Sequence, residues 1–471
     1  MNIFRFSILF YIALLFTNCK KAKTLEIAKE QPPNIIIILT DDQGYQDVGF
    51  NGSTDIKTPY LDELANNGAK FTNAYVTYPV CGPSRAGLIT GRYQDRFGFS
   101  RNPLFTPKDS LEGLPTSEQT LAEALKTANY RTMAVGKWHL GAHESQRPLN
   151  RGFDEFFGFL SGGHQYFPEM YTRNDISEVT SQFDAYNTKL LKNTQRVEET
   201  EYLTDALSRE AVNFIKNNQD ESFFLYLAYN APHSPMQATE KYLSRYAHIK
   251  DEKRRTYAAM VSAVDDGVGN ILNQLRQSGI EENTLIVFLS DNGGVLKFGA
   301  NNGELNKGKS SLYEGGVRVP FAMQWKGKIP AETVYEQPII SLDIFATAVE
   351  LANVTPQNQL HGKNLLPYLK KENNEIPHEK LYWRKYDQDL YSIRQGDFKL
   401  IKGKDGEHKL FNLKEDISET SSLNDTTQMD LLLKDYHQWN DQNIDPIFFG
   451  LLQDKNYNQL HPDRFEDVEQ Y

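Results

Sequence analysis

From residue 33 onward, uncharged apolar runs of strand length alternate with segments in which apolar residues recur at helical spacing. The first run, residues 34–40, reads NIIIILT and is rich in β-branched side chains, which is typical of a strand covered on both faces. Helical spacing extends over about residues 204–216 and 254–277, and Gly279 is expected to end the second helix. This alternation predicts an α/β fold with a mainly parallel sheet flanked by helices. Further strand-like runs occupy residues 131–135, 223–229 and 284–289.

Another helix is predicted to begin near residue 116. Thr116 and Gln119 have the spacing of a capping box, in which each side chain bonds to the backbone amide of the other residue. The apolar face of this helix would consist of Leu121, Ala124, Leu125 and Ala128.

The pattern changes after about residue 365, where short alternating segments separated by turn residues replace the long apolar runs. Alternation with a period of two predicts strands, and the GKDG sequence at 403–406 fits a turn between two antiparallel strands. We therefore expect a larger domain over residues 33–364 and a smaller C-terminal α+β domain over residues 365–471. The strand candidates of the smaller domain are residues 381–384, 391–394, 398–401 and 410–413.

The N-terminus has the pattern of an export signal. Arg5 precedes an uncharged, mostly apolar run over residues 6–16, which is too short to span a bilayer. The run leads to Cys19, as in bacterial lipoprotein signals, and the lysines that follow disfavour the alternative of a buried first helix. We expect a signal peptide at 1–19 with Cys19 as the candidate lipidation residue, and a tether at 20–32. The predicted location is the periplasm or cell envelope of a Gram-negative bacterium, or the medium if the signal is only cleaved.

Composition narrows the class of protein. The 471 residues include 51 Lys and Arg against 62 Asp and Glu, so the formal net charge is −11, which argues against a general nucleic-acid binder. The two cysteines, Cys19 and Cys81, exclude a disulfide scaffold and a cysteine-rich zinc site. No run outside the N-terminus is long and apolar enough to predict a membrane span.

Clusters of reactive residues follow each strong strand. Because the carboxyl ends of parallel strands meet at one edge of a sheet, these clusters are expected to lie together. Three carboxylates and one amide among them form an oxygen-rich set suited to Ca²⁺ or Mg²⁺ rather than zinc. Lysines, histidines and Arg85 would then face an anion, which suggests hydrolysis of a phosphate or sulfate ester. The clusters are Asp41-Asp42, Lys137 and His139, His233, and Asp291-Asn292.

The segment from Cys81 to Arg92 reads CGPSRAGLITGR and resembles the sulfatase signature C-x-P-S-R-x-x-x-x-T-G-R. The resemblance extends over most of residues 33–345 and, in family order, includes TDDQGY at 40–45, GKWHLG at 136–141 and RGFD at 151–154. It continues with APH at 231–233, SDNG at 290–293 and KSSLYEGGVRVP at 309–320. The chain departs from the family at Asn129, where glycine is usual, but asparagine also tolerates a left-handed backbone.

The resemblance implies a formylglycine-dependent type I sulfatase with an alkaline phosphatase-like fold, whose catalytic domain would be residues 33–364. A maturation enzyme would convert Cys81 to formylglycine, and the hydrated aldehyde would attack sulfur with one hydroxyl and release sulfate with the help of the other. Asp291 would also help to activate the attacking hydroxyl. The implied ligands of a calcium ion, which is expected ahead of magnesium, are Asp41, Asp42, Asp291 and Asn292.

The resemblance also implies roles for the basic residues around Cys81. Arg85 would orient the diol, and Lys137 and Lys309 would hold sulfate oxygens and offset the charge that grows in the transition state. His139 would assist deprotonation of the diol, and His233 would protonate the leaving sugar oxygen.

Family analogy predicts a sulfated carbohydrate as substrate, such as an oligosaccharide from the algal polysaccharides ulvan or carrageenan. One alternative is a phosphonate or phosphodiester hydrolase of the same superfamily. The other is a surface lipoprotein that binds sulfated glycans without turnover. The residues considered for sugar specificity are His164, Gln165, Tyr166, Arg318, Trp383 and Arg384.

Overall fold

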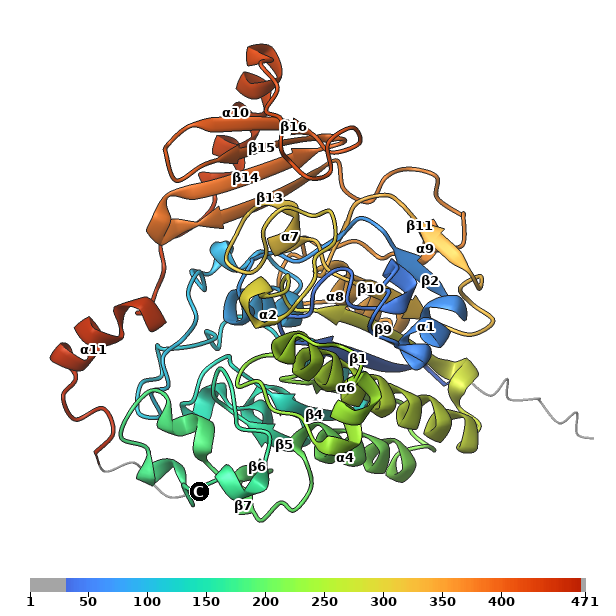
Figure 1. The fold of residues 1–471 in the computed structure, drawn as a ribbon, viewed down its shortest axis with the longest axis vertical. Coiled ribbons are helices and arrows are strands. Elements are labelled where there is room, and N and C mark those ends of the chain that lie inside the picture. The colour runs from blue at the N-terminus through green and yellow to red at the C-terminus, as the bar shows by residue number, and fades with distance from the viewer. Residues whose placement is uncertain (1–30, 467–471) are drawn as a thin grey trace, which may run out of the picture. The chain divides into compact units, whose positions relative to one another are not determined.

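The computed structural model describes residues 31–466 and has a large sheet at its centre (Figure 1). Its strand order is β11-β2-β10-β9-β1-β8-β4-β5-β6-β7. The five central strands are all parallel, as the sequence predicts, and four of them are the predicted apolar runs. These strands are β9 (Thr284–Ser290), β1 (Asn34–Thr40), β8 (Phe223–Ala228), β4 (Arg131–Lys137) and β5 (Glu155–Phe159).

Antiparallel pairs extend the sheet on both sides. β10 pairs with β9 on one side, and β6 pairs with β5 on the other. A separate short pair joins β12 to β3 in parallel. The remaining strands are β2 (Ala69–Phe71), β3 (Ala74–Tyr75), β6 (Leu190–Lys192), β7 (Gln195–Val197), β10 (Phe321–Gln324), β11 (Thr333–Tyr335) and β12 (Ile339–Ile340).

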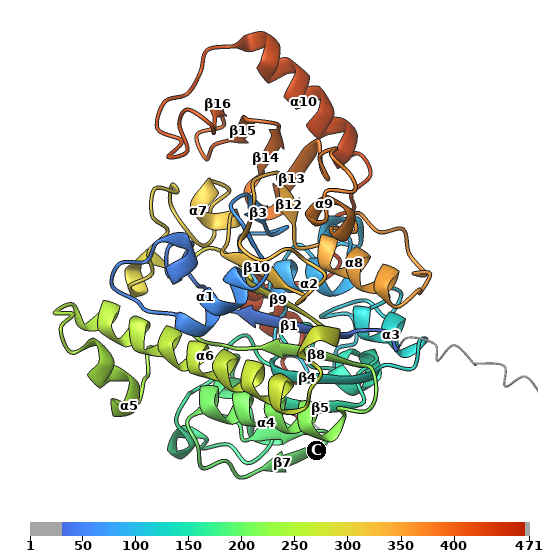
Figure 2. The same cartoon turned by 90° about the vertical axis from the view of Figure 1, so that its right-hand side faces the viewer.

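Helices cover both faces of the sheet, and β1 shows why. Its alternate residues Ile35 and Ile37 pack into one apolar cluster, whereas Ile36 and Ile38 pack into the other. The first cluster includes residues of α2 (Cys81–Thr90), α3 (Leu121–Lys126) and α8 (Asp343–Leu351). The second includes residues of α1 (Pro59–Asn66), α4 (Leu203–Asn217), α5 (Glu240–Leu243) and α6 (Glu252–Gln277), so the two sets of helices sandwich the sheet (Figure 2).

The capping box predicted at Thr116 and Gln119 is wrong by four residues. The structure forms it between Thr120 and Glu123, whose side chains and backbone amides exchange hydrogen bonds at the start of α3. The side chain of Gln119 instead accepts a hydrogen bond from the backbone N–H of Gln357. Because of this tertiary contact, it does not form a capping box with Thr116. Leu121, Ala124 and Leu125 are buried and Ala128 is partly buried against the same core, so the predicted apolar face is confirmed.

The C-terminal residues form the predicted antiparallel sheet, with α10 (Thr426–Asn440) packed against it (Figure 1). Residues 32–466 belong to one compact unit, and Trp383 of the small sheet donates a hydrogen bond to the carbonyl of Val76 at 2.7 Å. The boundary at residue 365 stays a prediction. The four strands are β13 (Lys380–Lys385), β14 (Leu390–Gln395), β15 (Phe398–Lys402) and β16 (His408–Asn412), and the other short helices are α7 (Glu314–Val317), α9 (Leu366–Leu369) and α11 (Asp454–Leu460).

The signal peptide, the tether up to residue 30 and Cys19 lie outside the described residues. Within residues 31–466, no helix is long and apolar enough to cross a membrane. The left-handed backbone expected at Asn129 is confirmed by its φ of 62°.

Gly136 fixes the end of β4 just before Lys137, and its replacement gives a test of the fold. Its φ is +100°, and a Cβ atom there would lie 2.0 Å from the carbonyl oxygen of Ala228 on β8. We expect Gly136→Ala to lower the free energy of unfolding by about 3 kcal/mol, because it combines backbone strain with a clash. Gly279→Ala, where φ is +69° and no atom lies within 4 Å, should cost only about 1 kcal/mol of strain. Urea unfolding measures both, and equal losses would contradict the role of close packing at Gly136.

Candidate active site

Four neighbouring parallel strands bring polar residues to one edge of the central sheet. β1 is followed by Asp41, β9 by Asp291, and β4 ends in Lys137. His233 follows β8 after a short loop. Because β9, β1, β8 and β4 are adjacent, their carboxyl ends meet, and this is where ligands bind in open α/β sheets. The structure therefore assembles the clusters that the sequence places after separate strands.

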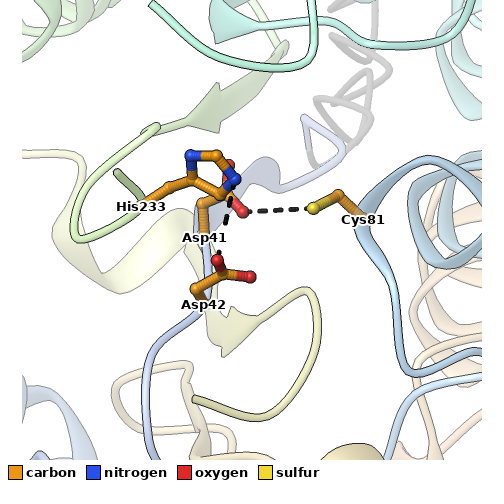
Figure 3. A group of neighbouring side chains, drawn as sticks. All are labelled: Asp41, Asp42, Cys81 and His233. Atoms are coloured by element: carbon orange, nitrogen blue, oxygen red, sulfur yellow. Dashed lines mark hydrogen bonds and ion pairs between the residues drawn. The ribbon is translucent and has the colours of Figure 1, made fainter. Parts of the chain in front are cut away.

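Cys81, the first residue of α2, lies among these residues and is only 1% exposed. Its Sγ donates a hydrogen bond to Asp41 Oδ1 at 3.4 Å and accepts one from Lys309 Nζ at 3.1 Å. Figure 3 shows the thiol pointing toward Asp41, and Asp42 and His233 lie next to Asp41. The predicted nucleophile is thus held between a carboxylate and a lysine.

The helix that carries Cys81 is fixed at both ends. The side chain of Asn102 accepts a hydrogen bond from the backbone N–H of Gly82 at 2.8 Å, which satisfies one of the free amides of the first turn. At the other end, Gly91 adopts a left-handed conformation and its N–H donates to the carbonyl of Gly87. These contacts hold the first residue of α2 in place.

Asp41, Asp42, Asp291 and Asn292 form an oxygen-rich group. The backbone N–H of Asp42 donates to Asp291 Oδ1 at 3.3 Å, and the amide nitrogen of Asn292 donates to Asp42 Oδ1 at 2.7 Å. Asn292 Oδ1 is buried and accepts no hydrogen bond from the described residues. A buried oxygen without a donor, beside three carboxylates, fits a hard cation such as Ca²⁺ or Mg²⁺. The residues present therefore fit the predicted ion.

A second set of potential ligand atoms overlaps this group. One ligand atom each from Asp41, Asp42, Cys81 and His233 lies within 4.8 Å of the others, so this set replaces Asp291 and Asn292 with a thiol and an imidazole. Burial, and then the charge of Asp41, raises the pKa of the Cys81 thiol to about 12. Because Ca²⁺ and Mg²⁺ prefer oxygen ligands to sulfur and nitrogen, the all-oxygen group is the better fit.

Three buried or nearly buried cations face the three carboxylates. The cations are Arg85, Lys137 and Lys309. Besides its carboxylate partner, Arg85 has a second contact: its Nη1 donates to the carbonyl oxygen of Lys137 at 2.9 Å, which links α2 to the end of β4. Charged groups removed from water are costly unless they are paired, so the pairing stabilises the site and fixes its geometry. The pairs are Arg85–Asp291 at 2.8 Å, Lys137–Asp41 at 2.5 Å and Lys309–Asp42 at 2.6 Å.

The two acids nearest Cys81 and Arg85 differ in pKa. Burial alone raises the pKa of a carboxyl group, but Lys137 and the other cations hold the pKa of Asp41 well below its usual range. Burial, followed by the charge of Asp41, raises the pKa of Asp291. The negative charge of this pair therefore resides first on Asp41, the acid that faces the thiol.

Two histidines complete the site. Burial, and for His139 also the charge of Lys137, lowers the pKa of both imidazoles, so they are neutral at pH 7. His233 Nδ1 donates to the carbonyl oxygen of Ser234 at 2.6 Å, which leaves Nε2 facing Asp42 Oδ2 at 3.7 Å. His139 Nδ1 is buried without a hydrogen-bond partner among the described residues. Each ring therefore has one nitrogen available for proton transfer.

A cavity of about 410 Å³ opens from Cys81, within the size range of small-molecule sites. His139, His233 and Lys309 line it together with Cys81. All ten residues predicted for catalysis and metal binding are thus brought to one place, although their roles stay predictions. The rest of the wall includes Tyr78, Arg101, Asn102, Pro103, Gln182, Tyr186, Ser310, Lys385, Asp387, Gln388 and residues 450–453.

The residues considered for sugar specificity do not line this cavity. His164, Tyr166 and Trp383 are fully buried, and Tyr166 donates hydrogen bonds to the carbonyls of Asn230 and His233. Their polar atoms therefore support neighbouring backbone. The others are likewise held by the protein: Arg318 bonds to Thr72 and Glu314, Arg384 to Asp95 and Ile444, and Gln165 to Asn187.

The sequence reasoning missed the outer wall of the cavity. Arg101 and Asp387 form an ion pair at 2.6 Å across almost 300 positions of sequence, and no motif marks either residue. Lys385 lies two residues after Trp383 on the same strand, so period-two alternation predicts the same buried face for both and does not mark Lys385 as a residue of the cavity wall.

Two family models match the chain. The model described as sulfatase matches residues 33–354, and the model described as N-sulphoglucosamine sulphohydrolase, C-terminal, matches residues 306–444. The first covers most of the described residues and includes all ten residues predicted for catalysis and metal binding.

Known proteins agree with this match. Human N-acetylgalactosamine-6-sulfatase is 37% identical over 357 residues, which are 72% of this chain and 66% of the relative, so the chain spans just under two thirds of that protein. The uncharacterized sulfatase YdeN of Escherichia coli is 34% identical to this chain, and the match covers 76% of this chain and 70% of the length of YdeN. The crystal structure of Ps i-CgsB in complex with k-i-k-neocarrahexaose has a TM-score of 0.85 and 40% identity, covering 93% of this chain and 100% of that one. The chain belongs to the sulfatase family.

Proposed function

We propose that this protein removes sulfate groups from a sulfated polysaccharide or its oligosaccharides, of the ulvan or carrageenan kind, with residue 81 as a formylglycine nucleophile. The observation that carries the proposal is the position of Cys81 Sγ between Asp41 and Lys309 in the wall of an open cavity. The similarity to Ps i-CgsB, whose structure contains a neocarrahexaose, supports a carrageenan-like substrate.

The basic residues around residue 81 would bind the sulfate group. Lys309 already contacts the side chain of residue 81, so a sulfate attacked there would lie within its reach. Lys137 and Arg85 are held nearby by Asp41 and Asp291 and would offset the charge that develops on the sulfate oxygens. The one ring proton of neutral His233 is on Nδ1 and is donated to the Ser234 carbonyl, so Nε2 would first take up a proton and would then give it to the leaving sugar oxygen.

Formylglycine supplies a hydrated aldehyde with two hydroxyl groups, so that one can attack sulfur and the other can help to expel sulfate. The test is a mass spectrum of protein produced together with a formylglycine-generating maturation enzyme, combined with rates on an aryl sulfate. We expect loss of sulfur from residue 81 and turnover that scales with the converted fraction. Fully active protein with an unmodified Cys81 thiol would refute the proposal.

A bound divalent cation, with calcium preferred, would polarise the sulfate group and offset its charge. We expect chelation to lower activity at least tenfold and to lower the melting temperature, because Asp41, Asp42 and Asp291 would lose a shared counter-ion. Calcium should restore both properties, and magnesium should restore them less well. Activity that survives exhaustive chelation, with no metal found by elemental analysis, would contradict the prediction.

Phosphonate or phosphodiester hydrolysis is the second candidate function, since a cavity that binds a tetrahedral sulfate monoester also accommodates a phosphoryl group. Comparing kcat/KM for an aryl sulfate and an aryl phosphodiester separates the two, and we expect the sulfate to be preferred. A glycan-binding lipoprotein without turnover is disfavoured by the complete set of reactive residues around Cys81. The proposed site of action is the periplasm or cell envelope, with lipidation at Cys19.

A further inference from the structure

A second cavity, of about 560 Å³, adjoins the first and shares Lys309 and Ser310 with it. Five lysines line it, whereas Asp405 is the one carboxylate in its wall. This is a local excess of positive charge in a chain whose net charge is −11. The five lysines are Lys307, Lys309, Lys402, Lys404 and Lys409.

Some of these lysines have counter-ions and others do not. Lys409 pairs with Asp405 at 3.2 Å, and Lys402 pairs with Asp389. Lys307 and Lys404 form no ion pair with any residue of the described part of the chain, although Lys307 Nζ lies 3.9 Å from the centre of the Tyr313 ring. Burial, and then the charge of Lys409, lowers the pKa of Lys307, as expected for a cation among other cations.

Lys385 lies in the first cavity and links the two. Lys385 is only 6% exposed, and its Nζ donates a hydrogen bond to the carbonyl oxygen of Ser310 at 2.6 Å. No carboxylate between residues 31 and 466 pairs with it. Burial, and then the charge of Lys404, lowers the pKa of Lys385 to about 8. An almost fully buried cation without an anion is unfavourable, so this position is suited to an anion that arrives with the substrate.

We propose that Lys307, Lys385 and Lys404, here named the lysine groove, bind a second anionic group on a sugar next to the one that loses its sulfate. This inference rests on the proposed function and assigns its substrate class: a saccharide chain with anionic groups on successive sugars. The groove binds a sulfate or a uronic acid carboxylate, because both offer oxygens to an ammonium group. Small aryl sulfates end at the first cavity and do not reach Lys307 and Lys404, which line only the second one.

The test compares K307Q/K404Q with the control K216Q/K253Q, which removes two exposed lysines from α4 and α6. For each protein, kcat/KM is measured for an aryl sulfate and for oligosaccharides whose neighbouring sugar carries a sulfate, a carboxylate or no charge. The quantity compared is kcat/KM for a charged oligosaccharide divided by kcat/KM for the aryl sulfate. We expect this ratio to fall about five- to tenfold in K307Q/K404Q, mainly because KM for the charged oligosaccharide rises. The control should keep the wild-type ratio.

The charged substrate whose ratio falls identifies the group that the lysine groove binds. A ratio that does not change for either charged oligosaccharide, or an equal fall for the uncharged one, would overturn the inference. If the matured wild-type protein turns over no sulfate ester, the proposed function fails, and calorimetric binding of the sulfated oligosaccharide then tests the groove separately. Weaker binding by K307Q/K404Q than by the control would support the groove, and equal binding would overturn it.

Discussion

Replacing Cys81 by serine is expected to lower multiple-turnover hydrolysis of an aryl sulfate by more than about 1,000-fold. A serine hydroxyl would sit where Sγ now lies, 3.1 Å from Lys309 Nζ and 3.4 Å from Asp41 Oδ1, and could still attack sulfur. Serine has no second hydroxyl on its Cβ to expel the sulfate, so the reaction should stop after one turnover. Rapid-quench kinetics should show a burst of up to one equivalent, and a mass spectrum should show added sulfate on residue 81.

Cys81→Ala is the matched control, because it removes the nucleophile and should give neither burst nor turnover. Both variants should keep the wild-type melting temperature and calcium binding, since the oxygen-rich group is unchanged. Full multiple-turnover activity of Cys81→Ser, in protein whose residue 81 is shown by mass spectrometry to be serine, would disprove the proposed chemistry.

Lys399→Met is expected to lower the free energy of unfolding by about 3–5 kcal/mol. Lys399 Nζ lies 2.7 Å from Glu314 Oε1 and 3.0 Å from Glu419 Oε1, and the side chains of all three are fully buried. Burial alone would raise the pKa of Glu314, but the charge of Lys399 lowers it from its usual value to about 2. The pKa of Glu419 is raised, first by burial. Without the lysine, two carboxylates would face each other in the protein interior.

The double variant Lys399→Met/Glu419→Gln provides the control, because it also removes one of the stranded charges while Arg318 still pairs with Glu314. We expect it to regain at least half of the lost stability in urea unfolding at pH 7. A loss below about 1 kcal/mol for the single variant, or no recovery in the double one, would show that these buried charges are not coupled.

The centre of the fold and of the site follows from local patterns. Buried parallel strands need continuous apolar runs, and the reactive residues that follow such runs must meet at the carboxyl edge of the sheet. Asp41, Lys137, His233 and Asp291 were predictable for this reason. The spacing from Cys81 to Arg85, just over one helical turn, likewise places both side chains toward this edge.

The edges of the sheet and the outer cavity wall were not predictable in the same way. Strands such as β2 and β7 have only three residues each, too few for any periodicity to be seen. The wall depends on residues brought together from distant segments, as in the Arg101–Asp387 pair. Trp383, which the sequence left open as either a sugar contact or a structural residue, packs in the core.

The buried charges around Lys399 also define where this protein can be recombined with its relatives. The segment that carries Lys309 is tied to the C-terminal sheet by Glu314, whose backbone N–H and carboxylate contact Glu419 and Lys399, and by Asn306, which donates to the carbonyl of Glu419. The second family model begins at residue 306, well before the first strand of that sheet. A chimaera that exchanges C-terminal sheets should therefore be joined near residue 305 rather than near 365, so that the lysine facing residue 81 is inherited together with the sheet that supports it.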